Sequence, residues 1–245
     1  MVTGRHGGVS SGAYATLNLG YATADEEGRV AANRDIVRDA MDIDPEQLMV
    51  AWLTHGTEVA VFRQDNPAGW PDRHEAVRPA SARTARAFRA DAAISDVPGL
   101  RFLLTFADCV PLLFVDPVRE VCGAAHAGWR GTAAGMASVV VSALRREFGS
   151  RPEDIHAAIG PSIGPCCYEV GEDVPASFHR HGLAPVMQGK RLDLWESTVR
   201  QLDRAGVKTI EVAGLCTRCN TDRFFSHRGE GGVTGRFALV AGLKA

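Results

Sequence analysis

The chain has 245 residues, of which 45% are hydrophobic and 23% are charged, and its formal net charge at pH 7 is −2. This length suffices to bury a large core, and the composition is that of an ordinary soluble globular protein. The near-neutral charge gives no electrostatic case for nucleic acid or an anionic membrane as the main partner. No apolar run approaches the roughly 18 residues of a membrane span, and residues 1–5 begin no signal peptide, so we expect a cytoplasmic protein.

The first part of the chain contains glycine-rich loops, one helical pattern and short apolar runs. Residues 3–20 predict a loop that leads to a short strand over 15–19, and residues 31–41 have the apolar spacing of a helix. Residues 48–53 are a strand candidate that ends just before His55. Residues 64–90, which carry three prolines and several arginines, predict an exposed excursion.

The remainder mixes strand and helix patterns without strict alternation. Strands are predicted over residues 100–106, 112–115, 120–125, 155–159, 208–213 and 237–243, and helices over 132–148 and 194–205. A loop rich in glycine, proline and cysteine is predicted over 160–171. This mixture favours a mixed α/β sandwich over a doubly wound parallel sheet, and no linker divides the single domain expected over 1–245.

Three short segments end apolar runs with a strong metal ligand beside small residues. They contain His55, Cys109 and His126. Two imidazoles and a thiolate form a three-ligand set for a borderline-soft ion, with a fourth position left for water or substrate. A structural zinc site normally uses four protein ligands, so an open set of three indicates catalysis. Taken singly, a cysteine such as Cys109 is more often a small core residue, but its place at a strand end favours function.

A glycine-rich turn follows His126 and enters a predicted helix. Free backbone N–H groups and the positive end of a helix dipole suit an anion. Arg130 offers a forked, charge-assisted contact to a phosphate. The alternative is a plain glycine turn with an exposed arginine, and the residues alone leave the two interpretations balanced, because phosphate loops are usually recognised by longer patterns.

The remaining cysteines are expected to be thiols, because a cytosolic chain rarely holds a disulfide framework. Cys216 and Cys219 have the spacing of half a zinc motif, and Cys166 with Cys167 is the pair that would complete it. Adjacent cysteines rarely chelate one tetrahedral ion comfortably, so a second metal site is disfavoured.

Ordered motifs along the whole chain provide a further line of inference. They are Gly4-Arg5-His6-Gly7-Gly8-Val9-Ser10, Leu17-Asn18-Leu19-Gly20, Ala32-Asn33-Arg34, His55-Gly56-Thr57, Thr105-Phe106-Ala107-Asp108-Cys109-Val110-Pro111, His126-Ala127-Gly128-Trp129-Arg130-Gly131, Gly160-Pro161-Ser162-Ile163-Gly164-Pro165-Cys166-Cys167, Arg223-Phe224-Phe225-Ser226-His227-Arg228 and Thr234-Gly235-Arg236. With these motifs the chain strongly resembles the laccase-domain, or polyphenol oxidase, family, which is now viewed as a family of purine nucleoside phosphorylases.

The resemblance implies one α/β domain layered α-β-β-α, distantly like the catalytic fold of cytotoxic necrotizing factor. It implies a zinc site formed by His55, Cys109 and His126. It also implies phosphorolysis of adenosine, inosine, guanosine and methylthioadenosine to free base and ribose 1-phosphate, with adenosine deamination as a second activity. Arg34 is carried over as a residue that holds phosphate or substrate, and Arg130 is added to it.

The chain departs from the family pattern in three places: an abrupt start at the Gly-Gly motif, Thr54 where an apolar residue is expected, and the unplaced residues 64–90. None of these departures touches the three expected ligands. The residue that carries a proton is not identified, although Asp108 is the candidate that its position suggests.

Other functions compete with the phosphorylase. A copper oxidoreductase acting on phenols would bind copper(II), which outcompetes zinc for such ligands. Multicopper oxidases need several His-x-His pairs, whereas this chain has eight histidines and one such pair, His179 and His181, in a segment expected to be an exposed loop. A metal-free hydrolase would use Cys109 as nucleophile and His126 as base. A non-catalytic zinc module is the last alternative.

Overall fold

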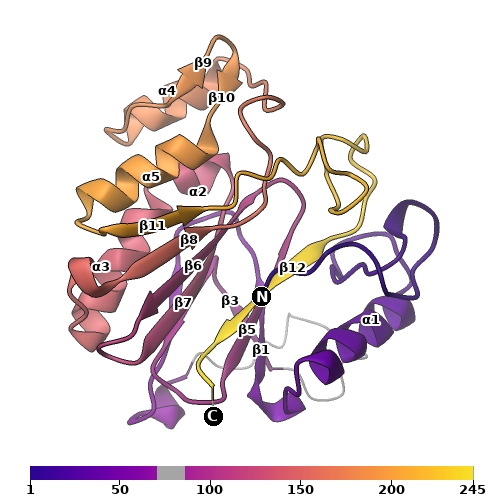
Figure 1. Cartoon of the computed structure of the whole chain (residues 1–245), viewed down its shortest axis with the longest axis horizontal. Helices are drawn as coiled ribbons and strands as arrows, with labels where there is room; N and C mark the ends of the chain where they lie inside the picture. Colours follow the sequence, from indigo (N-terminus) through magenta and orange to yellow (C-terminus); the bar gives the residue numbers. More distant parts are fainter. Residues whose placement is uncertain (71–85, 245) are drawn as a thin grey trace.

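Two mixed β-sheets pack face to face and are covered by helices on their outer faces (Figure 1). The structure is a computed structural model that describes residues 1–70 and 86–244. Strands β5 (Arg101–Phe106) and β12 (Phe237–Gly242) of the smaller sheet contact β7 (Val121–Ala127) of the larger one. The predicted α-β-β-α layering is therefore confirmed, and the likeness to cytotoxic necrotizing factor stays a prediction.

The smaller sheet has four strands in the order β12-β5-β1-β3. Their bounds are Leu48–Trp52 (β1), Arg86–Arg89 (β3), Arg101–Phe106 (β5) and Phe237–Gly242 (β12). Strand β1 is parallel to both β3 and β5, and β12 is antiparallel to β5.

The larger sheet has six strands in the order β11-β8-β6-β7-β4-β2. Their bounds are Val59–Phe62 (β2), Ala92–Ser95 (β4), Val110–Asp116 (β6), Val121–Ala127 (β7), His156–Ile159 (β8) and Thr209–Val212 (β11). The two outer pairs are parallel and the central pairs antiparallel. A separate hairpin joins β9 (Met187–Gln188) to β10 (Arg191–Leu192).

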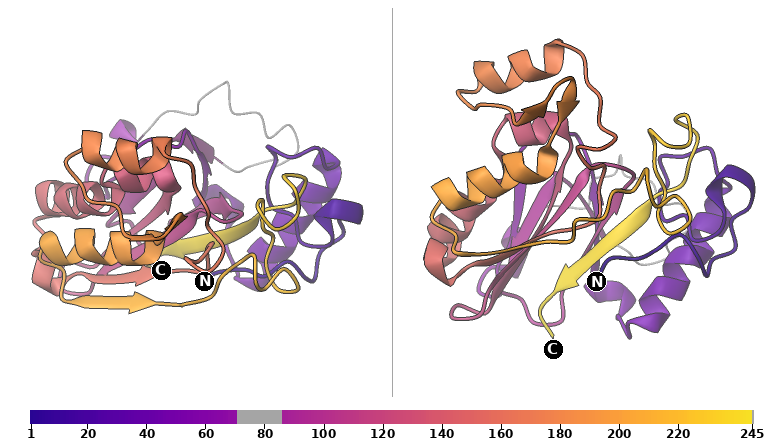
Figure 2. Two further views of the ribbon diagram at one scale, coloured as in Figure 1. Left: turned by 90° about the horizontal axis from the view of Figure 1, so that it is seen from above. Right: turned by 45° about the horizontal axis from the view of Figure 1, so that its top comes forward.

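Helix α1 lies on the opposite side of the sheets from the other helices, as the views in Figure 2 show. The helices are α1 (Glu27–Ala40), α2 (Trp129–Ala133), α3 (Met136–Phe148), α4 (Asp173–Arg180) and α5 (Leu194–Arg204), with single 3-10 turns at Gly12–Tyr14, Pro45–Gln47, Pro67–Gly69 and Pro152–Asp154. Among the described residues, no helix has the length and apolar character that a membrane crossing requires.

Alternation along the strands divides the core into layers, because successive side chains of a strand point to opposite faces. Phe102, Leu104 and Phe106 of β5 belong to the cluster between the sheets, whereas Leu103 packs with Val37 of α1 on the outer face. Each fully buried phenylalanine contributes roughly 1.5–3 kcal/mol relative to an exposed one. This inter-sheet layer holds rigidly the strand ends at which the site is built.

Most predicted elements lie within three residues of the observed ones at each end, except α1, which begins four residues before the predicted helix. The predicted strand over 15–19 is wrong, because those residues form loop and turn structure. The predicted helix over 132–148 is two helices, since Gly135 has φ 81° and ends the pattern between α2 and α3. The sequence predicts neither helix α4 nor strands β2, β4, β9 and β10.

The expected excursion over 64–90 is wrong at its end. Residues 86–89 form β3, which pairs in parallel with β1, and residues 71–85 lie outside the described part of the chain. Long-range pairing with β1 overrides the arginine-rich composition there, which local propensity alone does not reveal.

Candidate functional site

Three predicted residues converge where strands of both sheets end. His55 follows β1, Cys109 directly precedes β6, and His126 lies within β7. Their ligand atoms all lie within 4.8 Å of one another, and the two imidazole rings meet edge to face with centroids 5.0 Å apart. His126 is buried, Cys109 is half-buried and His55 is exposed. The cluster is therefore anchored on one side and open on the other.

A buried carboxylate that the sequence analysis missed organises this cluster. Asp91, fully buried, accepts a hydrogen bond from Nδ1 of His126 at 3.0 Å. His126 also interacts with the side chain of Cys109, so its imidazole lies between the Asp91 carboxylate and the thiol. A carboxylate that accepts a hydrogen bond from one ring nitrogen is the usual outer partner of a histidine that ligates a metal. It fixes both the tautomer and the orientation of the ring.

The same carboxylate also holds the loop that carries His55. Asp91 accepts hydrogen bonds from the backbone N–H groups of Thr54, His55 and Gly56 at 3.0, 2.9 and 2.9 Å, and from Oγ1 of Thr54 at 2.6 Å. Thr54, which departs from the expected apolar residue, therefore supplies a donor to Asp91. One side chain positions two of the three candidate ligands.

Charges and hydrogen bonds at the cluster shift the pKa values of Asp91, Cys109 and His126. Burial acts to raise the pKa of Asp91, but hydrogen bonds from His126, Thr54 and Gly56 outweigh it and lower that pKa to about 2. Burial likewise acts to raise the pKa of the Cys109 thiol, but the adjacent imidazoles lower it to about 6. Burial acts to lower the pKa of His126, yet Cys109 and Asp91 raise it to about 9. The arrangement thus favours a thiolate at Cys109, the form that binds metals and attacks electrophiles.

Two backbone features bring the chain close to the cysteine. A Cβ added at Gly128 would lie 2.9 Å from Sγ of Cys109, so only glycine fits there without displacing the thiol. His55 and Asp108 have φ of 61° and 84°, in the left-handed region that side-chain-bearing residues rarely occupy. Such outliers gather at functional sites, where the surrounding hydrogen bonds maintain them.

Asp108, the suggested proton carrier, is tied into a loop. One carboxylate oxygen accepts hydrogen bonds from Thr217 and Ser226, both at 2.7 Å, and the other accepts one from the backbone N–H of Arg228 at 2.6 Å. Asp108 directly precedes Cys109, so these hydrogen bonds tie the backbone beside the cysteine to the loop between β11 and β12. The contacts are those of a positioning residue.

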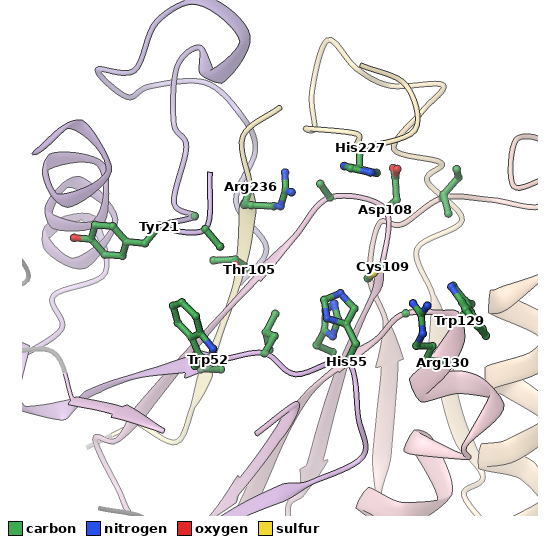
Figure 3. Close-up of a pocket in the computed structure, with 18 of the residues that line it drawn as sticks. Tyr21, Trp52, His55, Thr105, Asp108, Cys109, Trp129, Arg130, His227 and Arg236 are labelled. Atoms are coloured by element: carbon green, nitrogen blue, oxygen red, sulfur yellow. The ribbon is translucent and has the colours of Figure 1, made fainter. Parts of the chain in front are cut away.

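A cavity of about 580 Å³ opens onto the three candidate ligands. Figure 3 shows Tyr21 and Trp52 at one end of the pocket and Trp129 at the other, with His55 and Cys109 between them. The cavity is large enough for a small organic ligand, and its aromatic ends offer flat apolar faces.

Arginines supply the positive charge of this cavity. Arg34 is 7% exposed and donates from Nε and Nη2 to the carbonyl oxygen of Leu19, while its Nη1 is buried without a hydrogen-bond partner among the described residues. Burial lowers the pKa of Arg34 to about 10, so the side chain stays charged near neutral pH. A buried guanidinium with an unused donor fits an anionic ligand.

Arg130 also lines the cavity, but its setting differs from the prediction. It is exposed and stacks over the ring of Trp129, 4.2 Å from the centroid. Arg130 is the second residue of α2, which has only five residues, so the dipole of this helix is weaker than that of the long helix predicted from the sequence. Arg236, which the sequence analysis did not select, lines the same cavity.

The other four-cysteine set is also assembled, against expectation. The sulfur atoms of Cys166, Cys167, Cys216 and Cys219 lie within 4.8 Å of one another. His179 and His181, by contrast, stand exposed at the end of α4 rather than in the loop that was expected. Among the described residues, the histidines that line the cavity include neither member of this His-x-His pair.

The family model described as multi-copper polyphenol oxidoreductase laccase matches residues 1–244. The chain belongs to this family. "Purine nucleoside phosphorylase YlmD" of Geobacillus stearothermophilus is 37% identical over 255 residues, which cover 99% of this chain and 89% of the relative. "Purine nucleoside phosphorylase" of Deinococcus radiodurans is 37% identical over 246 residues, covering 98% and 87%.

Solved structures of this laccase family share the fold. The crystal structure of the Bacillus licheniformis hypothetical protein YfiH matches with a TM-score of 0.87 at 37% identity, covering 99% of this chain and 91% of that chain. YlmD from Geobacillus stearothermophilus matches with a TM-score of 0.84 at 34% identity, covering 100% and 91%.

Proposed function

We propose that this protein is a zinc-dependent purine nucleoside phosphorylase. The observation that carries the proposal is the open trio of His55, Cys109 and His126, held by Asp91 at the wall of a cavity with a buried arginine. The names of its relatives supply the substrate class, a purine nucleoside, and phosphate as the second substrate.

The donor set fits zinc. Two imidazole nitrogens and one sulfur with a free fourth position are the ligand types of catalytic zinc sites. The carboxylate of Asp91 on His126 is the outer contact that such sites require. Zinc bound there would supply a Lewis acid and lower the pKa of water toward about 7. Copper is the alternative ion for the same donors.

The reaction that we propose joins phosphate to the ribose. A phosphate oxygen forms a bond to C1′ while the glycosidic C–N bond breaks and the purine leaves with the electron pair. Arg34, with its unpartnered Nη1, is proposed to hold the phosphate at the Tyr21 end of the cavity, and Arg130, which stacks on Trp129, to contact the substrate at the other end. The two ends carry the aromatic rings of Tyr21, Trp52 and Trp129, and the proposal places the purine against one of these ends.

A second activity, deamination of adenosine, rests on the open side of the trio. His55, Cys109 and His126 all line the cavity, so a nucleoside and a water molecule would both have access to an ion that these residues held. The measurement is the conversion of adenosine to inosine in phosphate-free buffer. A protein that forms no inosine there, and releases only adenine when phosphate is added, would contradict this activity.

The phosphorylase proposal is tested with inosine. Purified protein should release hypoxanthine and ribose 1-phosphate only when phosphate is present. Turnover that is unaffected by phosphate would contradict phosphorolysis, and oxidation of phenols in place of nucleoside turnover would favour the copper oxidoreductase. Metal analysis of the same preparation identifies the ion.

The role of Arg34 is tested by Arg34→Lys, which keeps a charge but removes the planar fork. We expect the KM for phosphate to rise roughly 10- to 100-fold, because hydrogen bonds to charged groups contribute about 1.5–3 kcal/mol. Arg29→Lys, at a half-buried arginine of the same helix that does not line the cavity, is the matched control. An unchanged KM for phosphate in Arg34→Lys would remove this arginine from the phosphate site.

A further inference from the structure

Four cysteines outside the catalytic cavity form a second cluster with the geometry of a closed metal site. The sulfur of Cys219 lies 3.4 Å from that of Cys167 and 3.7 Å from that of Cys166, and all four sulfurs lie within 4.8 Å of one another. A tetrahedron of thiolates around zinc, with Zn–S of about 2.3 Å, has edges of about 3.8 Å. Small movements of these side chains would complete that tetrahedron.

Local backbone conformation explains why adjacent cysteines contribute together. Adjacent side chains of an extended strand point to opposite faces, but residues 165–167 form a turn, in which the N–H groups of Cys167 and Tyr168 bond to the carbonyl of Gly164 at 3.0 and 3.1 Å. Successive side chains of such a turn diverge less, so both sulfurs reach one side. The objection based on adjacency applies to an extended pair and not to this one.

The second pair lies in a turn of its own. The N–H of Asn220 bonds to the carbonyl of Cys216 at 3.1 Å, so Cys216 and Cys219 are spaced by about one helical turn and face the same way. A parallel bridge between Ser162 and Cys216 aligns the two loops. The backbone N–H of Gly164 also donates to Sγ of Cys216 at 3.3 Å, the kind of outer hydrogen bond that thiolate ligands receive.

Charge near the cluster matches an anionic metal–thiolate centre. Arg218, between Cys216 and Cys219, donates to the carbonyl of Cys167 at 3.3 Å. Zinc with four thiolates carries a net charge of −2, which a nearby guanidinium offsets. Cys166 and Cys219 are exposed, so an ion has a path to the cluster from solvent.

We propose that Cys166, Cys167, Cys216 and Cys219 bind one zinc ion as a structural site. The four thiols release their protons to solvent on binding, and no position remains open for substrate. The site would join the loop that carries Tyr168 to the loop whose Thr217 and Arg228 hold Asp108 beside Cys109. The second zinc thereby fixes one wall of the cavity without touching the reaction, independently of the proposed function.

Zinc content of purified variants tests this site without an activity assay. We expect two zinc ions per chain in the unmodified protein, and one in both Cys109→Ala and the double variant Cys166→Ser/Cys219→Ser. Cys122→Ala is the matched control, because Cys122 belongs to neither cluster and lies buried in the core; it should keep two. A double variant with the zinc content of the unmodified protein would overturn the proposal.

X-ray absorption of Cys109→Ala tests the ligands directly and does not depend on the double variant folding. The zinc in Cys109→Ala should have four sulfur neighbours at about 2.3 Å. A shell with nitrogen or oxygen ligands, or no zinc in this variant, would overturn the proposal. So would a disulfide among these cysteines in protein kept under reducing conditions and supplied with zinc. Failure of the catalytic trio to bind metal leaves all these outcomes readable, since the remaining zinc is counted in Cys109→Ala.

Discussion

The molecule contains two clusters rich in sulfur that differ in almost every respect. The trio of His55, Cys109 and His126 combines nitrogen and sulfur, is supported by strands of both sheets, and has a buried carboxylate behind it. The four-cysteine cluster is made of sulfur alone and sits on two loops near the surface. As the zinc sites that we propose, the trio would leave a coordination position open beside the cavity, and the four cysteines would leave none.

The difference teaches which features separate a reactive centre from a structural one. Strand β7, the adjoining ends of β1 and β6, and the carboxylate of Asp91 hold the proposed open set, because a metal with an open position needs ligands that do not rearrange when substrate binds. Loops suffice for a complete set, because four thiolates impose their own geometry once metal is present. Ligand number and support therefore indicate function more clearly than the presence of cysteine.

The largest expected effect separates the two clusters by removing one ligand from the trio. Cys109→Ala should lower kcat/KM by more than about 100-fold. Removing an outer hydrogen-bond partner of a metal ligand typically lowers activity about 10- to 100-fold, and this variant removes a ligand itself. Steady-state kinetics and zinc content measure the result, with Cys122→Ala as control. A variant that is inactive yet keeps its zinc in the trio would favour Cys109 as a nucleophile instead of a ligand.

A smaller effect is expected from the carboxylate that only the trio possesses. Asp91→Asn retains the shape of the side chain but weakens the hold on Nδ1 of His126, so affinity for metal should fall roughly 10- to 100-fold. Competition with a chelator measures this affinity. Asp39→Asn, an exposed acid on α1, is the control. Unchanged affinity in Asp91→Asn would mean that the imidazole is oriented by packing alone.

The pH dependence of stability offers a test on chelator-treated protein. The pKa of Asp91 is lowered from 3.8 to about 2, so its contribution is complete above pH 3.8 and is lost as pH falls through about 2. This loss amounts to about 2 kcal/mol of unfolding free energy. Denaturant unfolding at pH 5 and near pH 2 should show a smaller decrease in Asp91→Asn than in the unmodified protein. Equal decreases would contradict the shift.

The smallest effect concerns the close approach of backbone to the cysteine. Gly128→Ala places a Cβ 2.9 Å from Sγ of Cys109, so the thiol must move and metal affinity of the trio should fall about tenfold. Gly28→Ala on α1, where nothing lies within 4 Å of the added Cβ, is the control and should keep full metal content. Undiminished affinity in Gly128→Ala would show that the cysteine has room to shift.

The sequence indicates the trio because each member stands at the end of an apolar run. In the structure these runs are strands whose ends meet at the same edge of the fold. Local pattern suffices for that step, as it does for strands such as β5 and β7. It does not suffice for Asp91, whose partners Thr54 and His126 are 37 and 35 residues away. The available signal is an acid between alanines at the start of an apolar run, which indicates a buried carboxylate in need of donors.

The sequence names all four cysteines of the second cluster, but it disfavours their assembly, for a different reason. Its assembly depends on the backbone conformation at Cys166 and Cys167, and two neighbouring residues give opposite answers in a strand and in a turn. Pro165 directly before the pair is the local sign of a turn. The pairing of that loop with Cys216 lies beyond any local pattern, because it joins segments about 50 residues apart.

The pairing of β4 with β7 determines where the protein tolerates insertions. Ala92 pairs with Ala125, so Asp91 stands opposite His126, and the backbone N–H of His126 donates to the carbonyl of Asp91 at 2.7 Å. A single-residue insertion in either strand would turn one of these side chains to the other face of the sheet. Insertions should therefore be confined to loops away from β4 and β7, and substitutions in these two strands meet packing on both faces, because every residue of both strands is buried.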